Sequence, residues 1–342
     1  MYKKPSLLIV RDGFFLFISG YGYLEIDTGS MSSKKFIQAL LEENISGLTK
    51  VPKADLHNHS IYCTRIEHIE SWIGHPVPHP PASMKSLNEM IGYTRKSLYP
   101  CIDSREGFEF TSRSALRDAI EDGVAILEMS MDVRFISFFG SSPDPFVFIH
   151  DLVESTKPDI HFRPEIGLSK DSQAGEQMRS ASCCIQSGLF RSIDLYGNET
   201  AQSPSCFRES FVEARKHGLK LKAHVGEFEG PDLISETLDT LELNEIQHGI
   251  AAARSVALMN RLRCDDIRLN ICPSSNVALG VVGDLAHHPI RILVDNGIRV
   301  TLNTDDLTIF GQSASHEYLS LYRSGLMTAA ELDFIRLEGL SS

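Results

Sequence analysis

Histidine and carboxylate side chains stand at the ends of several short apolar segments of this chain. His57 and His59 follow one such segment, His224 closes a second, and Asp305 follows a third. Residues two apart on a strand point to the same side, so His57 and His59 can serve one site. Neutral imidazoles and a carboxylate, with one position left open for water, are typical of catalytic zinc sites. The four residues therefore predict a site for one zinc ion, which lowers the pKa of bound water to roughly 7.

Three more polar residues follow the same kind of segment. Glu227 lies three residues after His224, His248 closes another apolar segment, and Asp306 follows Asp305 directly. Glu227 can protonate a ring nitrogen while hydroxide attacks the neighbouring carbon. His248 can hold that hydroxide in line or take its proton, and Asp306 can accept a hydrogen bond from a substrate nitrogen. Singly, each residue also fits an ordinary polar group, and Glu227 fits an acid near a helix N-terminus. Together they favour a catalytic metal site.

The elements that must position these residues alternate between short β-branched segments and longer amphipathic ones, which is typical of a parallel sheet with helical crossovers. Eight candidate strands end within residues 54–57, 125–128, 161–166, 192–195, 221–224, 245–248, 268–271 and 299–303. Candidate helices between them cover residues 112–122, 173–187, 205–217, 232–241, 252–263 and 285–296. Eight such strands predict an α/β fold, a single (β/α)8 TIM barrel with catalytic groups at the carboxyl ends of its strands. The alternative, an open doubly wound sheet, lacks its G-x-G-x-x-G run after the first strand.

Two segments stand outside this regular pattern. Residues 60–103 include a proline-rich loop and a candidate helix over 84–96, and they are expected to form an insertion after the first strand that caps the pocket. Residues 1–30 are expected to be either a small strand pair or a non-native extension, with Met31 as an alternative start and residues 31–342 as the barrel. Their apolar pieces are too short to span a bilayer, and no A-x-A cleavage site follows them.

Composition narrows the class of protein. The 342 residues carry 42% hydrophobic and 23% charged side chains, as in an ordinary soluble globular protein. A formal net charge of −12 disfavours nucleic acid as a partner, because affinity for phosphates rests mainly on Lys and Arg. Seven cysteines without paired spacing favour a reducing compartment, so we expect a cytoplasmic protein with no membrane partner. No feature of the sequence specifies an oligomeric state.

Five short strings give the chain a more specific resemblance. They are Leu-His-Asn-His at 56–59, His-Val-Gly-Glu at 224–227, His-Gly at 248–249, Cys-Pro-Ser-Ser-Asn at 272–276 and Leu-Asn-Thr-Asp-Asp at 302–306. In order and spacing this series resembles the adenosine deaminase family of the amidohydrolase superfamily, from about residue 51 onward. The resemblance implies a (β/α)8 barrel and zinc-dependent hydrolytic removal of ammonia from a 6-aminopurine. The family usually carries more chain after the last strand than residues 313–342 provide. A terminal helix of the family can therefore be missing here.

The resemblance also implies a role for each residue of the site. The zinc ligands would be His57, His59, His224 and Asp305. Glu227 would donate a proton to N1 of the purine, and His248 would orient the hydroxide. Asp306 would contact N7, and Gly197, in the string Asp-Leu-Tyr-Gly-Asn-Glu at 194–199, would contact N3 through its backbone.

One departure from the family pattern concerns the substrate. Adenosine deaminases usually continue the histidine pair with an acid that binds the ribose 5′-hydroxyl, and here Ile61 stands at that place. A lost buried hydrogen bond of this kind typically costs about 1 to 3 kcal/mol. We therefore expect ribose recognition to be absent or rebuilt by the 63–96 insertion, with an adenosine-like nucleoside or a related aminopurine as the substrate.

Two alternatives keep the fold but change the function. Related amidohydrolases cleave cyclic amides or esters, often with two metals bridged by a carboxylated lysine at the end of strand four. Residues 194–197 contain no lysine, which favours a single metal. The second alternative is a non-catalytic relative that binds a purine, and the complete set of proposed ligands together with Glu227 speaks against it.

Overall fold

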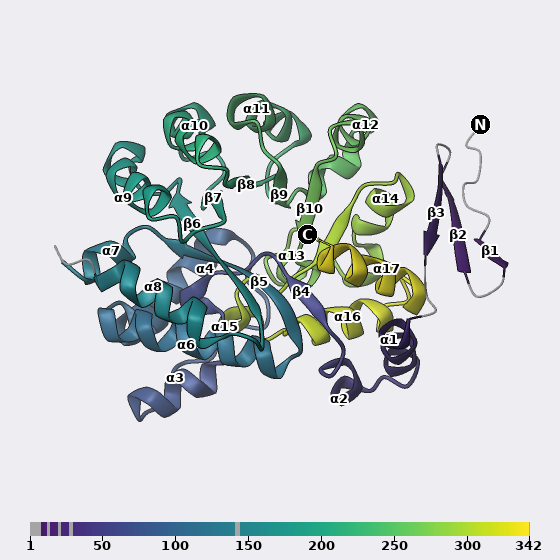
Figure 1. The fold of residues 1–342 in the computed structure, drawn as a ribbon, viewed down its shortest axis with the longest axis horizontal. Helices are drawn as coiled ribbons and strands as arrows, with labels where there is room; N and C mark the ends of the chain where they lie inside the picture. Colours follow the sequence, from purple (N-terminus) through teal and green to yellow (C-terminus); the bar gives the residue numbers. More distant parts are fainter. Residues whose placement is uncertain (1–7, 12–13, 20–21, 27–29, 141–143, 342) are drawn as a thin grey trace.

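A single parallel sheet of eight strands forms the centre of the molecule (Figure 1). The computed structural model describes residues 8–11, 14–19, 22–26, 30–140 and 144–341. The eight strands follow one another in chain order: β4 (Lys53–Asp55), β5 (Val124–Asp132), β6 (His161–Ser169), β7 (Ser192–Tyr196), β8 (Lys220–Val225), β9 (Glu245–His248), β10 (Arg268–Ile271) and β11 (Val300–Leu302). Each strand pairs in parallel with the next.

The two edges of this sheet meet just beyond β4 and β11. Asn58 and Asp305 form a parallel bridge, and the Asp305 backbone N–H donates to the His57 carbonyl at 3.0 Å. The side-chain oxygen of Asn303 accepts from the Leu56 N–H at 2.8 Å. These bonds bring the first and last strands together, so the predicted (β/α)8 barrel is confirmed.

Strands β5 and β6 run several residues beyond their predicted ends. Their ladder continues from Ile126 opposite His161 to Asp132 opposite Gly167. Side chains alternate across a strand, and along the end of β5 the buried Met131 stands between the polar Ser130 and Asp132. The sequence prediction stopped where the continuous apolar segment ended, because inward polar residues near the site interrupt the pattern.

Helices surround the barrel on the outside (Figure 1). The longer ones are α6 (Arg105–Glu121), α8 (Asp144–Ser155), α9 (Ala174–Gln186), α10 (Arg208–Lys216), α11 (Pro231–Leu241), α12 (Val256–Cys264), α16 (Ala314–Arg323) and α17 (Ala329–Leu340), and the shorter α14 (Ile290–Asp295) lies between β10 and β11 in the chain. Three of the predicted helices begin as 3-10 turns, which are η3 (Pro204–Phe207), η4 (Ile250–Arg254) and η5 (Leu285–His287). Shorter helices α7 (Phe135–Phe138), α13 (Pro273–Ala278) and α15 (Leu307–Phe310) lie in the loops after β5, β10 and β11.

Buried ion pairs fill the inside of the barrel away from the strand ends. The Lys222 ammonium on β8 lies 2.7 Å from a Glu165 oxygen and also pairs with Glu128 and Glu245. All four side chains are nearly inaccessible to water. Buried charges are tolerated when they are paired and hydrogen-bonded. The interior is therefore filled by side chains at this level, and the cavity described below is lined by residues at the carboxyl ends of the strands.

The predicted insertion after the first strand covers those carboxyl ends. It contains a 3-10 turn (η1, Ser60–Tyr62), α3 (Ile66–Ile73), α4 (Leu87–Tyr93), a π-helical turn (η2, Thr94–Leu98) and α5 (Tyr99–Ile102). Leu98 and Ile102 pack with Ile69 and with Ile309 of α15 in a small apolar cluster. Helix α4 turns Leu87 and Met90 toward the cavity described below. The expectation that this segment caps the pocket is met.

The N-terminal segment contributes three short antiparallel strands rather than two. They are β1 (Leu8–Arg11), β2 (Phe14–Ser19) and β3 (Gly22–Ile26). They lie at the right edge of the view in Figure 1, apart from the barrel, and α1 (Met31–Leu41) and α2 (Ile45–Leu48) follow. The division of the chain at residue 30 stays a prediction. None of the helices described is long and apolar enough to cross a membrane.

Candidate active site

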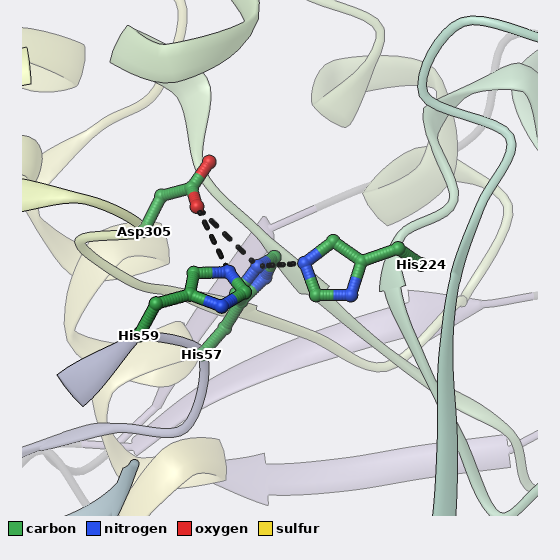
Figure 2. Close-up of side chains that lie close together, drawn as sticks. All are labelled: His57, His59, His224 and Asp305. Carbon is green, nitrogen blue, oxygen red and sulfur yellow. Dashed lines mark hydrogen bonds and ion pairs between the residues drawn. The ribbon is translucent and has the colours of Figure 1, made fainter. Parts of the chain in front are cut away.

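Four side chains from three barrel strands converge at the carboxyl end of the sheet. His57 and His59 follow β4, His224 lies on β8, and Asp305 follows β11. One ligand atom from each lies within 4.8 Å of the others, and Figure 2 shows the three rings and the carboxylate directed at one point. The Asp305 carboxylate lies 3.7 Å from Nε2 of His57 and 3.4 Å from Nε2 of His59. The structure thus brings together all four residues predicted as zinc ligands.

The outer nitrogens of two of these histidines have fixed hydrogen-bond partners. Nδ1 of His57 lies 3.0 Å from the Asn270 carbonyl oxygen, and Nδ1 of His224 lies 3.0 Å from the Asp194 carboxylate. Both Nδ1 atoms therefore donate, which leaves a lone pair on each Nε2 atom. These two Nε2 atoms are only 2.9 Å apart. Two lone pairs at that distance repel unless a cation lies between them, so the donor set fits a metal ion.

Asp305 is held in an unusual backbone conformation. Its φ is +58°, a region that residues with a side chain rarely adopt. The Ser275 hydroxyl donates to its Oδ2 at 2.6 Å, which leaves Oδ1 facing the histidines. The neighbouring histidines hold the pKa of Asp305 well below its usual range despite its burial. A strained backbone of this kind is common at functional sites.

Asn276 joins Glu227 and His248 in a second buried group beside the predicted metal ligands. Its side-chain N–H donates to Glu227 Oε1 at 2.6 Å and to Nδ1 of His248 at 3.2 Å, and its oxygen accepts from His288 at 3.1 Å. Since Nδ1 of His248 accepts, its hydrogen is on Nε2, which lies 3.4 Å from Glu227 and 3.7 Å from Asp305. Burial lowers the pKa of His248 to about 3, so the ring is neutral.

The position of Glu227 is set by a buried carboxylate. Glu199 accepts hydrogen bonds from the backbone N–H groups of Gly226, Glu227 and Phe228 at 2.7 to 2.9 Å. This fixes the turn after β8 and directs the Glu227 side chain into the site. Burial, with Asp305 and Glu199 nearby, raises the pKa of Glu227 well above its ordinary value. Glu227 is therefore more readily protonated than an exposed glutamate.

Asp306 and Gly197 line the cavity next to this group. Asp306 is buried, and its Oδ1 has no hydrogen-bond partner among the residues described. Burial raises the pKa of Asp306 to about 8. Gly197 has a φ of +97°, and a Cβ there would lie 2.4 Å from Asp171 Oδ2. Only glycine fits that position, which leaves its backbone open to the cavity. The unpaired oxygen and the open backbone can each bind a polar atom of a ligand.

A cavity of about 250 Å³ is lined by most of these groups, including Glu227, His248 and Asp306. The predicted metal ligands His59, His224 and Asp305 lie in its wall, and the α4 and α5 region of the insertion also lines it. Ile61 also lines the cavity, without a carboxylate at this place. A small organic molecule that enters the cavity therefore meets predicted metal ligands, the buried acid Glu227 and the neutral imidazole of His248 together.

Several side chains that organise the site were not assigned from the sequence. They are Asp194 behind His224, Glu199 behind Glu227, Ser275 behind Asp305, and Asn276 between Glu227 and His248. The sequence did contain a signal for them, because all four lie in the quoted motif strings. Asp194 and Glu199 are the first and last residues of one string, and Ser275 and Asn276 are the last two residues of another. What was missing was the pairing, which depends on distances between different strands.

Comparison with known proteins identifies the family. The family model described as adenosine deaminase matches residues 81–342. A protein of Treponema pallidum named putative adenosine/adenine deaminase is 36% identical over 282 residues, which cover 81% of this chain and 93% of the relative. The chain therefore belongs to the adenosine deaminase family and is a hydrolytic deaminase, which confirms the resemblance predicted from the motif series.

Solved structures agree on the fold. An adenine deaminase from Arthrobacter aurescens superimposes with a TM-score of 0.67 at 22% identity and covers 85% of this chain and 98% of its own. An amidohydrolase from Burkholderia ambifaria with bound Zn gives a TM-score of 0.70 at 18% identity, with 93% and 88% of the two chains covered. At these identities the likeness supports the barrel architecture.

Proposed function

We propose that this protein is a zinc-dependent deaminase of 6-aminopurines, with one zinc per chain held by His57, His59, His224 and Asp305. The observation that carries the proposal is the convergence of three imidazoles and one carboxylate beside a buried acid. The 2.9 Å approach of two imidazole nitrogens supports a bound cation. Nitrogen and oxygen donors in this number suit zinc, and the name of the Burkholderia structure records Zn in a barrel of the same fold.

Zinc in such a site supplies hydroxide at neutral pH by lowering the pKa of water. Glu227 donates its proton to N1 of the purine, which makes C6 more electrophilic for attack by hydroxide. His248 is neutral with its hydrogen on Nε2, so it orients the attacking oxygen by donating a hydrogen bond. Of the two roles expected for His248, this favours orienting the hydroxide over removing its proton.

Asp306 and Gly197 orient the base. The raised pKa of Asp306 and its unpaired oxygen support a hydrogen bond with N7. The open backbone of Gly197, in a conformation that only glycine adopts there, supports a contact with N3. With Glu227 at N1, three nitrogens of the purine are engaged, so that C6 faces the metal ligands.

The alternative of a two-metal hydrolase is less well supported. No lysine stands at the end of β7, and two buried lysines of the barrel, Lys222 and Lys170, already have partners. Lys222 pairs with carboxylates on the side of the barrel away from the site, and the Lys170 ammonium donates to the Glu199 carbonyl at 2.8 Å. Neither can bridge two metals in this arrangement.

The free cysteines and the net charge bear on the location of the enzyme and on the class of its substrate. All seven cysteines are free, which supports a reducing compartment and hence a cytoplasmic location. The substrate is a small neutral aminopurine, and a net charge of −12 disfavours a nucleic acid polymer in its place.

The experiment is ammonia release from adenine, adenosine and N6-substituted purines by protein whose zinc content has been measured. We expect one zinc per chain and release from at least one of these purines, lost on chelation and restored by added zinc. Zinc-loaded protein that releases no ammonia from any of them would refute the proposal, and two zincs per chain would favour the alternative hydrolase.

A further inference from the structure

His288 is a buried histidine to which the proposed chemistry gives no role. It stands in the connection between η5 and α14, is only 1% exposed, and does not line the cavity described above. The residue before a proline favours an extended backbone, and His288, which precedes Pro289, has φ −65° and ψ 134°. The helix predicted over residues 285–296 is therefore split at this point, and both ring nitrogens of His288 meet polar groups.

A backbone N–H determines which of these nitrogens carries the hydrogen. The N–H of Ile290, the first residue of α14, has no partner inside the helix and donates to Nδ1 of His288 at 3.1 Å. A backbone N–H can only donate, so Nδ1 is an acceptor and the hydrogen of the neutral ring lies on Nε2. Burial lowers the pKa of His288 to about 4, which keeps the ring neutral near pH 7. Nε2 of His288 is therefore a donor.

This donor sets the orientation of the Asn276 side-chain amide. Nε2 of His288 lies 3.1 Å from Oδ1 of Asn276, and of the two amide atoms only the oxygen accepts a hydrogen bond. The amide nitrogen consequently points away from His288, and it lies 2.6 Å from Glu227 Oε1 and 3.2 Å from Nδ1 of His248. If the amide turned over, its nitrogen would meet the His288 hydrogen and this bond would be lost.

The same chain of hydrogen bonds reaches the groups that act on the purine. Because the Asn276 amide donates to Nδ1 of His248, that ring presents its Nε2 hydrogen to the site. Because the amide also donates to Glu227 Oε1, the other oxygen of the acid is left 3.4 Å from Nε2 of His248. Asn276 and His248 are both buried, and a satisfied buried network holds its members in one arrangement. The backbone N–H of Ile290 thus sets the direction of every hydrogen bond in this chain.

We propose that His288 is a positioning residue for the deamination, because it orients the Asn276 amide that holds Glu227 and His248 in their reactive arrangement. The inference rests on the proposed function, in which Glu227 and His248 act on the purine. His288 itself does not line the cavity, so its contribution is to kcat and not to the binding of the substrate.

Two substitutions separate the two hydrogen bonds of His288. His288→Gln keeps an N–H group at the distance of Nε2 and loses the acceptor for Ile290. His288→Asn keeps an oxygen at the distance of Nδ1 and loses the donor to Asn276. A positioning role impairs catalysis in the asparagine variant and spares it in the glutamine variant, whereas a purely structural role at the start of α14 reverses this order.

The matched control is His287→Asn, which makes the same substitution at the neighbouring histidine. The His287 side chain is exposed and pairs with Asp284, so it is outside the chain of hydrogen bonds. His288→Ala takes the place of His288→Asn if the asparagine variant does not fold.

The measurement is kcat and KM for the purine that the wild type deaminates fastest. Rates are expressed per bound zinc, so that unfolded protein does not enter them. We expect His288→Asn to lose about tenfold or more in kcat and in kcat/KM alike, because a misplaced catalytic group costs rate and not binding. His288→Gln and His287→Asn should stay within about threefold of the wild type.

A double-mutant cycle tests whether the effect passes through Asn276. In an Asn276→Ala background the chain is already broken, so His288→Asn should change kcat by less than about twofold. A purely structural effect would lower kcat by the same factor in both backgrounds. Wild-type kcat in His288→Asn, equal losses in the asparagine and glutamine variants, or equal factors in the two backgrounds would overturn the inference. A zinc-loaded wild type that deaminates no purine would instead refute the proposed function, and the inference with it.

Discussion

Replacement of Glu227 by glutamine removes a proton donor while it changes little else in the site. The Glu227 side chain is 7% exposed, and its Oε1 accepts from Asn276 at 2.6 Å. Glutamine retains an oxygen at that place. Its amide nitrogen would replace Oε2, 3.4 Å from His248. Fold, zinc binding and the Asn276 contact are therefore expected to survive in Glu227→Gln.

The catalytic loss can be sized from the role of the acid. General acid catalysis by a positioned side chain contributes about 10² to 10⁴ in rate. At about 1.36 kcal/mol for each factor of ten, this is roughly 2.7 to 5.4 kcal/mol of activation free energy. Since burial raises the pKa of Glu227, the wild-type side chain holds a proton more readily than an exposed glutamate. We therefore expect kcat of Glu227→Gln to be lower than that of the wild type by a factor of about 10² to 10⁴.

The assay is steady-state ammonia release, with zinc content and Tm measured on the same samples. Glu227→Asp is the matched control, because it keeps the acid but withdraws it by one methylene, and its kcat should lie between those of the wild type and the glutamine variant. A glutamine variant with full zinc content and a kcat within about tenfold of the wild type would remove Glu227 from the role of proton donor.

Three further predictions concern the metal and the barrel. Asp194→Asn should weaken zinc binding by roughly 10- to 100-fold, because the carboxylate orients His224; competition with a chelator measures this, and an unchanged Kd would contradict it. Gly167→Ala should cost about 1 to 3 kcal/mol of unfolding free energy through its contact with Ser130. Gly175→Ala, whose added methyl would meet nothing within 4 Å, should be neutral or stabilising, and equal Tm values for the two variants would speak against the packing argument. Zinc at about 100 times its Kd should raise the unfolding free energy by about 2.7 kcal/mol, and an unshifted denaturant midpoint would exclude binding to the folded state.

The strand ends were the part of the fold most accessible from the sequence. Strands β9 and β10 have the predicted bounds, and every residue in them is buried, although polar and apolar residues are mixed in both. The end of β5 was missed, since Ser130 and Asp132 point inward and interrupt the apolar signal. With it, the sequence prediction missed Asp132, whose carboxylate accepts a hydrogen bond from the Tyr196 hydroxyl.

The residues of the site also fall into a group that the sequence could predict and a group that it could not. His57, His59, His224 and Asp305 could be predicted because parallel strands deliver their carboxyl ends to one face of a barrel. The partners behind them could not, because they depend on register. Asp194 lies beside His224 only because β7 and β8 pair with Asp194 opposite Lys222, two residues before the histidine. No local pattern in either strand specifies that offset.

The most direct test of the proposed reaction is the source of the oxygen in the product. Zinc-loaded protein is incubated with adenine in water enriched in the heavy oxygen isotope, and the deaminated purine is analysed by mass spectrometry. Hydrolytic attack at C6 predicts one heavy oxygen in each product molecule and one ammonia released with it, with neither formed by chelated protein. Ammonia release without incorporation of heavy oxygen, or formation of both by metal-free protein, would contradict the account.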